Sequence, residues 1–163
     1  NLSIKNGLDK LTEKDVQIIW QTGKLYAADA RAAASTYQTE KLVVTDFVSR
    51  MDYAYSIADL VISRAGASSI SELCLLAKPV ILVPSPNVAE DHQTKNALAL
   101  VNKDAAIMIR DMDASNDLVS KTLELISDNP TLERLSKNIL QLALPNSADR
   151  IAEEVFKIIK KSN

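Results

Sequence analysis

A short apolar run, a turn of small residues and the start of a helical pattern follow one another in Ala58-Asp59-Leu60-Val61-Ile62-Ser63-Arg64-Ala65-Gly66-Ala67-Ser68-Ser69-Ile70-Ser71-Glu72. This order predicts a strand at 60–63 and a helix from residue 69. Open α/β sheets bind ligands at the carboxyl ends of their strands, where a small turn lets an anion approach the free N–H groups of the next helix. Residues 66–69 are therefore predicted to offer backbone donors to a phosphate.

Two charged side chains flank this turn, and each has two interpretations. Ser69-Ile70-Ser71-Glu72 fits a capping box, in which Glu72 accepts a hydrogen bond from the first amide of its own helix. Alternatively, Glu72 accepts hydrogen bonds from the two hydroxyls of a ribose, for which an acceptor-only carboxylate is suited. Arg64, at the strand end, either pairs with a phosphate or forms a surface ion pair.

A second polar segment follows the next apolar run: Val83-Pro84-Ser85-Pro86-Asn87-Val88-Ala89-Glu90-Asp91-His92-Gln93-Thr94-Lys95-Asn96-Ala97. Its prolines favour an extended loop, and Asp91 is a candidate N-cap, so His92 and Gln93 fall in the first turn of a helix. Because neighbouring parallel strands end at one edge, we expect both segments to open on the same side of the sheet. His92 is either structural or, beside a phosphate site, functional.

Short β-type runs alternate with helical periodicity along most of the chain, which is typical of an α/β fold with a Rossmann-like parallel sheet and helices on both faces. Strands are predicted at 16–20, 42–44, 60–63, 80–83 and 106–109. Helices are predicted near 4–11, 24–36, 50–58, 69–77, 92–102, 115–127, 131–142 and 147–161. Ser115, Asn129 followed by Pro130, and Asn146 followed by Ser147 supply start signals for the last three. One domain over residues 1–163 accounts for the whole pattern.

Composition excludes several classes of protein. A net charge of −2 with scattered basic residues gives no electrostatic surface for nucleic acid. The single cysteine, Cys74, lies in an apolar run and is predicted to be a buried structural thiol of a reducing compartment. One cysteine and one histidine cannot build a zinc site, and we predict neither a metal nor a cofactor. The chain has neither a bilayer-spanning apolar stretch nor a signal-peptide pattern.

The predicted last helix carries a one-sided apolar stripe at positions 148, 151, 152, 155, 156, 158 and 159. Such a stripe packs against another surface, which is either the sheet of this domain or a second domain. Because the chain starts at Asn1 without an initiator methionine, we expect a longer protein with a further half ahead of it.

Several motifs together resemble one enzyme family. They are the stretch from Ala58 to Leu73, Pro79-Val80-Ile81-Leu82-Val83-Pro84, Asp91-His92-Gln93-Thr94-Lys95-Asn96-Ala97, Trp20-Gln21-Thr22-Gly23-Lys24 and Thr45-Asp46-Phe47-Val48-Ser49-Arg50-Met51. They are similar to the undecaprenyldiphospho-muramoylpentapeptide β-N-acetylglucosaminyltransferases. The resemblance extends from about residue 16 to the last helix.

This resemblance implies the two-domain fold called GT-B, of which the chain is similar to the C-terminal, donor-binding half. UDP-N-acetylglucosamine is the implied ligand of this half. The N-terminal half, expected outside this chain, would bind the acceptor lipid I and supply the base. The implied reaction is inverting transfer to the muramoyl 4-hydroxyl, giving lipid II on the cytoplasmic side of the bacterial inner membrane, with the enzyme bound peripherally. In the family a strand and a glycine-rich turn precede the first helix of this half, and we expect the chain to begin after them.

The site residues follow from the same resemblance. The backbone of Val48 would contact uracil, and Gln93, with His92, would contact the sugar. Arg64 joins this set as a candidate phosphate ligand because of its place at the strand end, and not because of the resemblance. The diphosphate and ribose would lie along Ala67, Ser68, Ser69, Ile70, Ser71 and Glu72. No catalytic residue is expected within this chain.

Other functions stay open. One is another GT-B enzyme that uses a UDP-sugar, such as a UDP-N-acetylglucosamine 2-epimerase or a glycosyltransferase with a different lipid acceptor. A second is a non-catalytic subunit that binds the nucleotide sugar beside a membrane partner. A third is a regulatory α/β module without a ligand, in which Glu72 caps its helix and Arg64 forms a surface pair.

Overall fold

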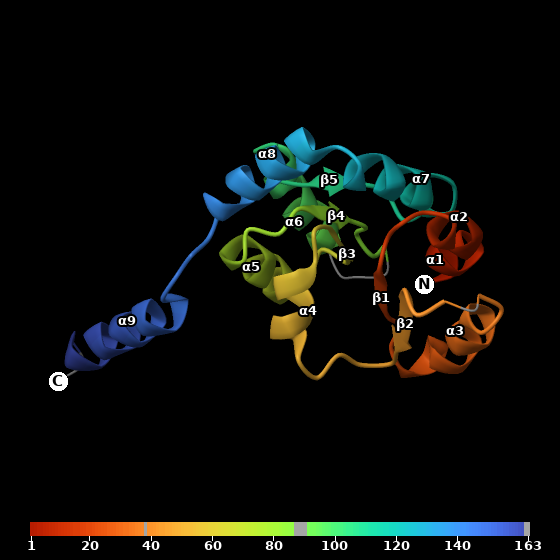
Figure 1. Ribbon diagram of the computed structural model, residues 1–163. Helices are drawn as coiled ribbons and strands as arrows, with labels where there is room; N and C mark the ends of the chain where they lie inside the picture. Colours follow the sequence, from red (N-terminus) through yellow and green to blue (C-terminus); the bar gives the residue numbers. More distant parts are fainter. Residues whose placement is uncertain (38, 87–90, 162–163) are drawn as a thin grey trace.

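The computed structural model describes residues 1–37, 39–86 and 91–161 (Figure 1). Its strands are β1 (Ile18–Gln21), β2 (Leu42–Thr45), β3 (Val61–Ser63), β4 (Val80–Leu82) and β5 (Ile107–Met108). Its helices are α1 (Leu2–Asn6), α2 (Leu8–Thr12), the 3-10 helix η1 (Lys24–Tyr26), α3 (Ala27–Ala34), α4 (Met51–Ile57), α5 (Ala67–Leu75), α6 (His92–Val101), α7 (Ala114–Ile126), α8 (Asn129–Leu140) and α9 (Ser147–Lys161). This alternation confirms the predicted α/β class.

The strands form two parallel sheets, where the sequence predicted one. β1 pairs with β2, and the pairing ends where Gln21 lies opposite Thr45. In the other sheet β4 lies between β3 and β5, with Leu82 opposite both Ser63 and Met108. All five predicted strands are present, although β1 begins two residues later than predicted and β5 is only two residues long. Among the described residues, no strand connects β1 to β3.

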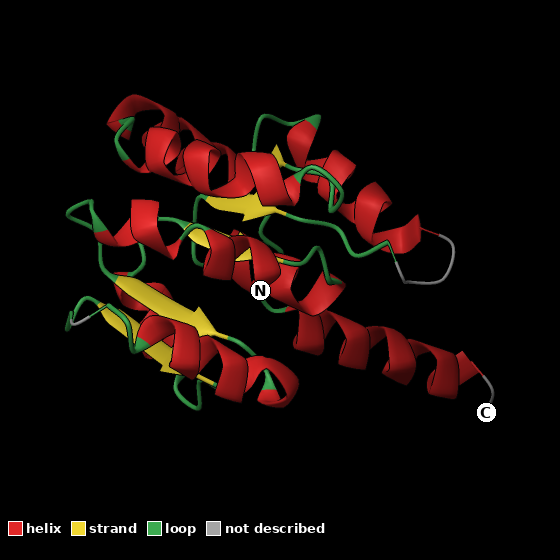
Figure 2. Ribbon diagram, turned by 90° about the vertical axis from the view of Figure 1, so that its right-hand side faces the viewer, coloured by secondary structure: helices red, strands yellow, loops and turns green. Residues whose placement is uncertain are grey.

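Strand β4 forms the apolar centre of the three-stranded sheet. Val80, Ile81 and Leu82 have no solvent exposure. Val80 and Leu82 belong to a core cluster with residues of α5 and α6, whereas Ile81 belongs to a cluster with residues of α7. This division follows from the alternation of side chains along a strand. Helices therefore cover both faces of this sheet, as predicted (Figures 1 and 2).

The prediction of a buried thiol is also confirmed. Cys74 is 4% exposed and lies in the cluster that contains Val80 and Leu82. Burial raises the pKa of the Cys74 thiol, since an apolar environment disfavours the thiolate. Cys74 thus packs as a small apolar side chain.

Helices α1 and α2 hold the two sheets together. Ile4 packs against the cluster around Ile81 and also against the cluster of Leu8, Trp20 and Ala30 beside β1. Figure 1 shows the two helices next to α7, on the side of β1. The helix predicted near 4–11 is thus two short helices that meet at Gly7.

Three predicted helix starts are corrected by the backbone. Helix α7 follows Asp113, so Ser115 lies inside it. Asp128 caps α8, and its carboxylate accepts a hydrogen bond from the Thr131 N–H at 3.2 Å. Several polar residues in a row can serve as caps, and the sequence alone does not choose among them. The third correction, at α5, changes the interpretation of the site and is described below.

Helix α9 extends away from the rest of the molecule (Figures 1 and 2). The predicted apolar stripe is present, and its large members are all exposed: Ile151, Val155, Phe156, Ile158 and Ile159. The interpretation that this helix packs on the sheet of its own domain is therefore wrong. Within the described part of the chain, no helix is long and apolar enough to cross a membrane.

Replacing Gly7 tests the contact between α1–α2 and α7. A Cβ at this position would lie 2.5 Å from Val119 Cγ2, so Gly7→Ala must push the two elements apart. We expect a loss of about 1–3 kcal/mol in the free energy of unfolding, measured by urea denaturation. Gly66→Ala is the matched control, because its Cβ would meet only Ser69 Oγ, at 3.9 Å. Equal unfolding midpoints for the two variants would contradict this role of Gly7.

Candidate functional site

The segments that follow the strands lie at the carboxyl edges of the two sheets. Because β3 and β4 are parallel neighbours, the segments that follow them leave the sheet at the same edge. Asn1 Nδ2 donates to the Thr22 carbonyl, just after β1, at 2.9 Å. Asn1 thus contacts the end of β1.

The N-terminus of α5 points into this region. Gly66 precedes the helix in an extended conformation, and the first helical hydrogen bond runs from the Ile70 N–H to the Gly66 carbonyl at 3.0 Å. The N–H groups of Ala67, Ser68 and Ser69 come before that bond, so they have no acceptor one turn earlier in the helix. An open helix N-terminus of this kind favours an anion, and the phosphate site at residues 66–69 stays a prediction.

The capping-box interpretation of Glu72 is wrong. The helix begins at Ala67, two residues earlier than predicted, so Ser69 lies inside its first turn and does not cap it. Glu72 is an exposed residue of the second turn and interacts with Tyr55 of α4. Burial, the charge of Glu72 and a hydrogen bond to that carboxylate together raise the pKa of the Tyr55 phenol. Glu72 therefore lies close enough to Tyr55 for its charge to act on the phenol.

Arg64 joins the ends of three strands. Its Nη1 donates to the carbonyls of Val83 at 3.1 Å and Pro84 at 3.3 Å, beyond β4. The same nitrogen pairs with Asp111, which follows β5. The predicted alternative of a surface ion pair is therefore present, with the added function of tying the loop after β4 to β3.

The second polar segment lies where the sequence predicted it. Asp91 precedes α6, and both His92 and Gln93 belong to its first turn. Gln93 Oε1 accepts a hydrogen bond from the Ser85 N–H at 2.9 Å, and His92 is exposed. Residues 87–90 of the predicted segment lie outside the described residues. Asn96, which the sequence did not single out, donates to the Ala65 carbonyl at 3.1 Å and so ties α6 to the turn before α5.

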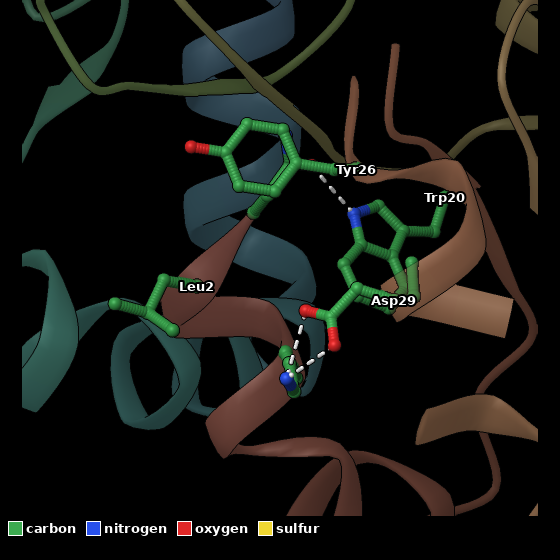
Figure 3. A pocket seen from close by; sticks show the side chains of 7 residues that line it. Leu2, Trp20, Tyr26 and Asp29 are labelled. Carbon is green, nitrogen blue, oxygen red and sulfur yellow. Dashed lines mark hydrogen bonds and ion pairs between the residues drawn. The ribbon is translucent and has the colours of Figure 1, made fainter. Parts of the chain in front are cut away.

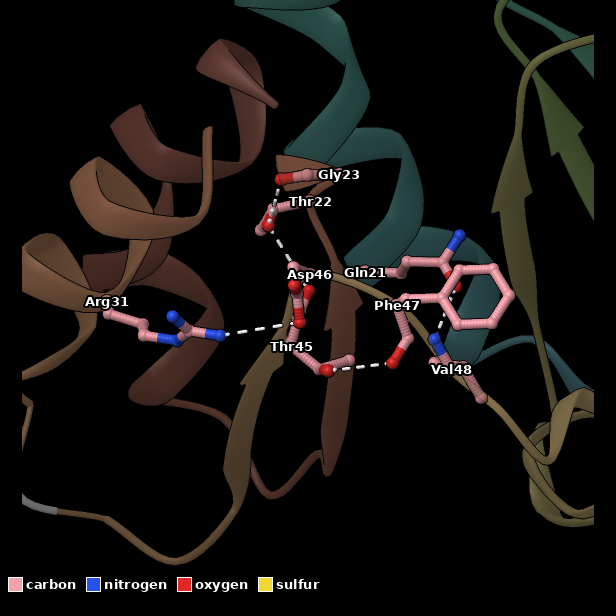
Figure 4. Close-up of polar contacts among 8 residues, drawn as sticks. All are labelled: Gln21, Thr22, Gly23, Arg31, Thr45, Asp46, Phe47 and Val48. Carbon is pink, nitrogen blue, oxygen red and sulfur yellow. Dashed lines mark hydrogen bonds and ion pairs between the residues drawn. The ribbon is translucent and has the colours of Figure 1, made fainter. Parts of the chain in front are cut away.

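Val48 follows β2 at the carboxyl end of the smaller sheet. Its N–H donates to Gln21 Oε1 at 2.8 Å, so a side chain from the end of β1 reaches over to the loop after β2 (Figure 4). Gln21 lay within a recognised motif, but nothing in the sequence pointed to its contact with Val48. Tyr55 and Asp111 gave no sequence signal, because each acquires its role from a distant strand or helix.

Comparison with protein-family models gives a match over residues 1–153 to the glycosyltransferase family 28 C-terminal domain. This match covers most of the chain. The chain belongs to glycosyltransferase family 28.

Two curated relatives of this family-28 domain carry the name UDP-N-acetylglucosamine--N-acetylmuramyl-(pentapeptide) pyrophosphoryl-undecaprenol N-acetylglucosamine transferase. The protein of Parabacteroides distasonis is 62% identical over 161 residues, which cover 99% of this chain and 44% of the relative. The protein of Phocaeicola vulgatus is 59% identical over 162 residues, which cover 99% of this chain and 43% of the relative. The chain therefore spans less than half the length of these relatives.

A solved structure supports the same assignment. The crystal structure of Acinetobacter baumannii MurG matches with a TM-score of 0.79 and 25% sequence identity, over 95% of this chain and 48% of that one. The chain thus has the fold of one half of a family-28 glycosyltransferase.

A hollow beside α1 contains none of the predicted site residues (Figure 3). It is bounded by the ion pair of Lys5 with Asp29, at 2.8 Å, and by the hydrogen bond from Trp20 Nε1 to Asn1 Oδ1, at 3.0 Å. Across the described residues, no group of histidine, cysteine, aspartate or glutamate side chains is arranged to hold a metal ion.

Arg64→Ala tests whether Arg64 is a structural link or a phosphate ligand. Loss of its contacts with Val83, Pro84 and Asp111 should lower the free energy of unfolding by about 1 kcal/mol, no more because the side chain is half exposed. Arg110→Ala removes an exposed pair with Asp113 and should change stability by less than about 0.5 kcal/mol. Thermal or urea unfolding measures both. Unchanged stability combined with lost pyrophosphate binding would identify Arg64 as a phosphate ligand instead.

Proposed function

We propose that this chain is the donor-binding half of an inverting N-acetylglucosaminyltransferase, which transfers N-acetylglucosamine from its UDP carrier to lipid I and forms lipid II. The observation that carries the proposal is the N-terminus of α5, whose free N–H groups at Ala67 to Ser69 lie at the carboxyl edge of the sheet, with Glu72 one turn further. The names and high identity of the family-28 relatives support the choice of donor and acceptor.

Each part of the donor would meet a suitable group at the carboxyl edges of the two sheets. The diphosphate would accept hydrogen bonds from the N–H groups at the start of α5, and the ribose hydroxyls would donate to Glu72. The uracil base would contact the backbone of Val48. Gln93 and His92 would contact the N-acetylglucosamine sugar. Gln93 is suited to this role because its bond to Ser85 fixes the carboxamide.

The chemistry needs no covalent intermediate. A base removes the proton of the muramoyl 4-hydroxyl, the oxygen attacks C1 of N-acetylglucosamine, and the C1–O bond to UDP breaks with its electron pair on the leaving phosphate. The dipole of α5 and its N–H donors stabilise the negative charge that develops on UDP. We place the catalytic base and the groove for lipid I in an N-terminal half, as the length of the relatives suggests.

We further propose that a strand preceding Asn1 fills the space between β1 and β3. Asn1 lies at the carboxyl edge of the smaller sheet, where its Nδ2 donates to the Thr22 carbonyl. At the opposite, amino edge, a hollow of about 720 Å³ lies between Val16 and Asp59, which precede β1 and β3. A segment that runs from this hollow to Asn1 would be parallel to both strands and would join the two sheets into one.

A longer protein would also explain the exposed apolar face of α9. We propose that the exposed apolar face of this helix packs against the N-terminal half, which removes Ile151, Val155 and Phe156 from water. The whole enzyme would act on the cytoplasmic face of the bacterial inner membrane as a peripheral protein, in peptidoglycan synthesis, and would thereby affect cell shape and division. Its partners would be UDP-N-acetylglucosamine, lipid I and that membrane face, with no nucleic acid.

Glu72→Ala tests the donor site. Loss of a charge-assisted hydrogen bond to ribose should weaken UDP-N-acetylglucosamine binding by about 1.5–3 kcal/mol, measured by isothermal titration calorimetry. Glu153→Ala, an exposed glutamate of α9, is the matched control and should bind as the parent does. GDP should bind neither the parent nor the two variants. Equal affinity of the Glu72 and Glu153 variants would remove Glu72 from the site.

Hydrogen exchange tests the proposed N-terminal half. In a protein that carries this half, the amides of β1, β3 and α9 should exchange more slowly than in the present chain, because new backbone and apolar partners protect them. Mass spectrometry of both proteins measures the difference, and α7, which is already packed, is the internal control. If α9 exchanges equally in the two proteins, it does not dock there.

A further inference from the structure

The loop after β2 keeps its conformation through contacts that do not involve the Gln21 side chain. Four contacts hold this loop: two backbone hydrogen bonds that continue the pairing of β1 with β2, one side-chain hydrogen bond within the turn, and one ion pair (Figure 4). They are Thr22 N–H to Thr45 O at 2.9 Å, Gly23 N–H to Asp46 O at 3.1 Å, Thr45 Oγ1 to Phe47 O at 2.9 Å, and Arg31 to Asp46 at 3.5 Å. The loop does not need Gln21 to hold its shape.

Gln21 nevertheless takes a specific partner in this loop. It is the last residue of β1, its side chain is exposed, and its Oε1 accepts a hydrogen bond from the Val48 N–H at 2.8 Å. The pairing of β1 with β2 ends at Thr45, so the Val48 N–H belongs to no strand ladder. The carboxamide therefore occupies a backbone donor at the open edge of the sheet.

A carboxamide and a uracil base present the same chemistry to such a donor. Each has a carbonyl oxygen next to an N–H group, whereas cytosine carries an amino group where uracil has its 4-carbonyl. The Val48 N–H carries one hydrogen, so it cannot donate a full hydrogen bond to the Gln21 carboxamide and to a uracil carbonyl at the same time. A base that binds to the Val48 backbone must therefore replace the Gln21 carboxamide.

We propose that Gln21 competes with the nucleobase carbonyl for the Val48 N–H and thereby sets the affinity for uridine nucleotides. This inference rests on the proposed function, in which the base contacts the Val48 backbone. Nucleotide binding exchanges one amide hydrogen bond for another, so the contact with Val48 adds little net affinity. Gln21 lowers affinity for uridine ligands and leaves the affinity for a ligand without a base unchanged.

Variants of Gln21 with opposite expected effects test this competition. Gln21→Ala removes the competing acceptor and should tighten UDP binding about two- to ten-fold, the worth of one exposed neutral hydrogen bond. Gln21→Glu offers the Val48 N–H a charged acceptor and should weaken UDP binding relative to the parent. Gln17→Ala, at an exposed position before β1, is the matched control and should bind as the parent does.

Calorimetry with UDP, CDP and pyrophosphate on each variant distinguishes the outcomes, and the amide resonance of Val48 in two-dimensional NMR reports the exchange of partners directly. The expected result is tighter binding by Gln21→Ala of UDP, but not of CDP or pyrophosphate. In the parent chain, UDP should shift the Val48 amide resonance and the Gln21 side-chain resonances. Weaker UDP binding by Gln21→Ala, with affinity retained by Gln21→Glu, would overturn the proposal and make Gln21 a positioning residue. If the parent chain binds pyrophosphate but neither UDP nor CDP, and the Val48 resonance does not move, the proposed base contact fails as well.

Discussion

The complete burial of β4 is the constraint on which the rest of this structure depends. Val80, Ile81 and Leu82 have no exposure, and alternate side chains enter two different core clusters, so helices must cover both faces of the sheet. A sheet covered on both faces is built here from parallel strands joined by helical crossovers. All strands then end at one edge, and each is followed there by a loop or by the N-terminus of a helix. The donor site proposed above is a consequence of that arrangement.

The edge is organised by side chains that bind backbone groups of neighbouring loops. Arg64 reaches the carbonyls after β4, Gln93 accepts from Ser85, and Asn96 donates to Ala65. These bonds fix the turn before α5 and the loop before α6 relative to each other. Polar groups held in this way keep their orientation when a ligand arrives, which reduces the ordering that binding requires. The bond between Gln21 and Val48 differs from these, because the loop after β2 is already held by other contacts.

Two features among the described residues underlie the N-terminal half proposed above. The strands divide into two sheets that α1 and α2 connect through Ile4, and α9 exposes its apolar face. Backbone groups at a sheet edge and an apolar helix face are both stabilised by burial against further protein. The family-28 relatives are more than twice as long as this chain, which is consistent with that N-terminal half.

The sequence by itself determined the positions of the five strands, most of the helical segments, the buried Cys74 and the turn of small residues ahead of α5. Those features depend on periodicity and composition within a few residues, which local interactions dictate. It did not determine where α5 begins, that Glu72 interacts with Tyr55, or that Gln21 binds Val48. Only the tertiary structure decided these, and it also decided that Arg64 pairs with Asp111, a partner 47 positions away. Such contacts depend on which strands are neighbours and where each strand ends, and no local pattern carries that information.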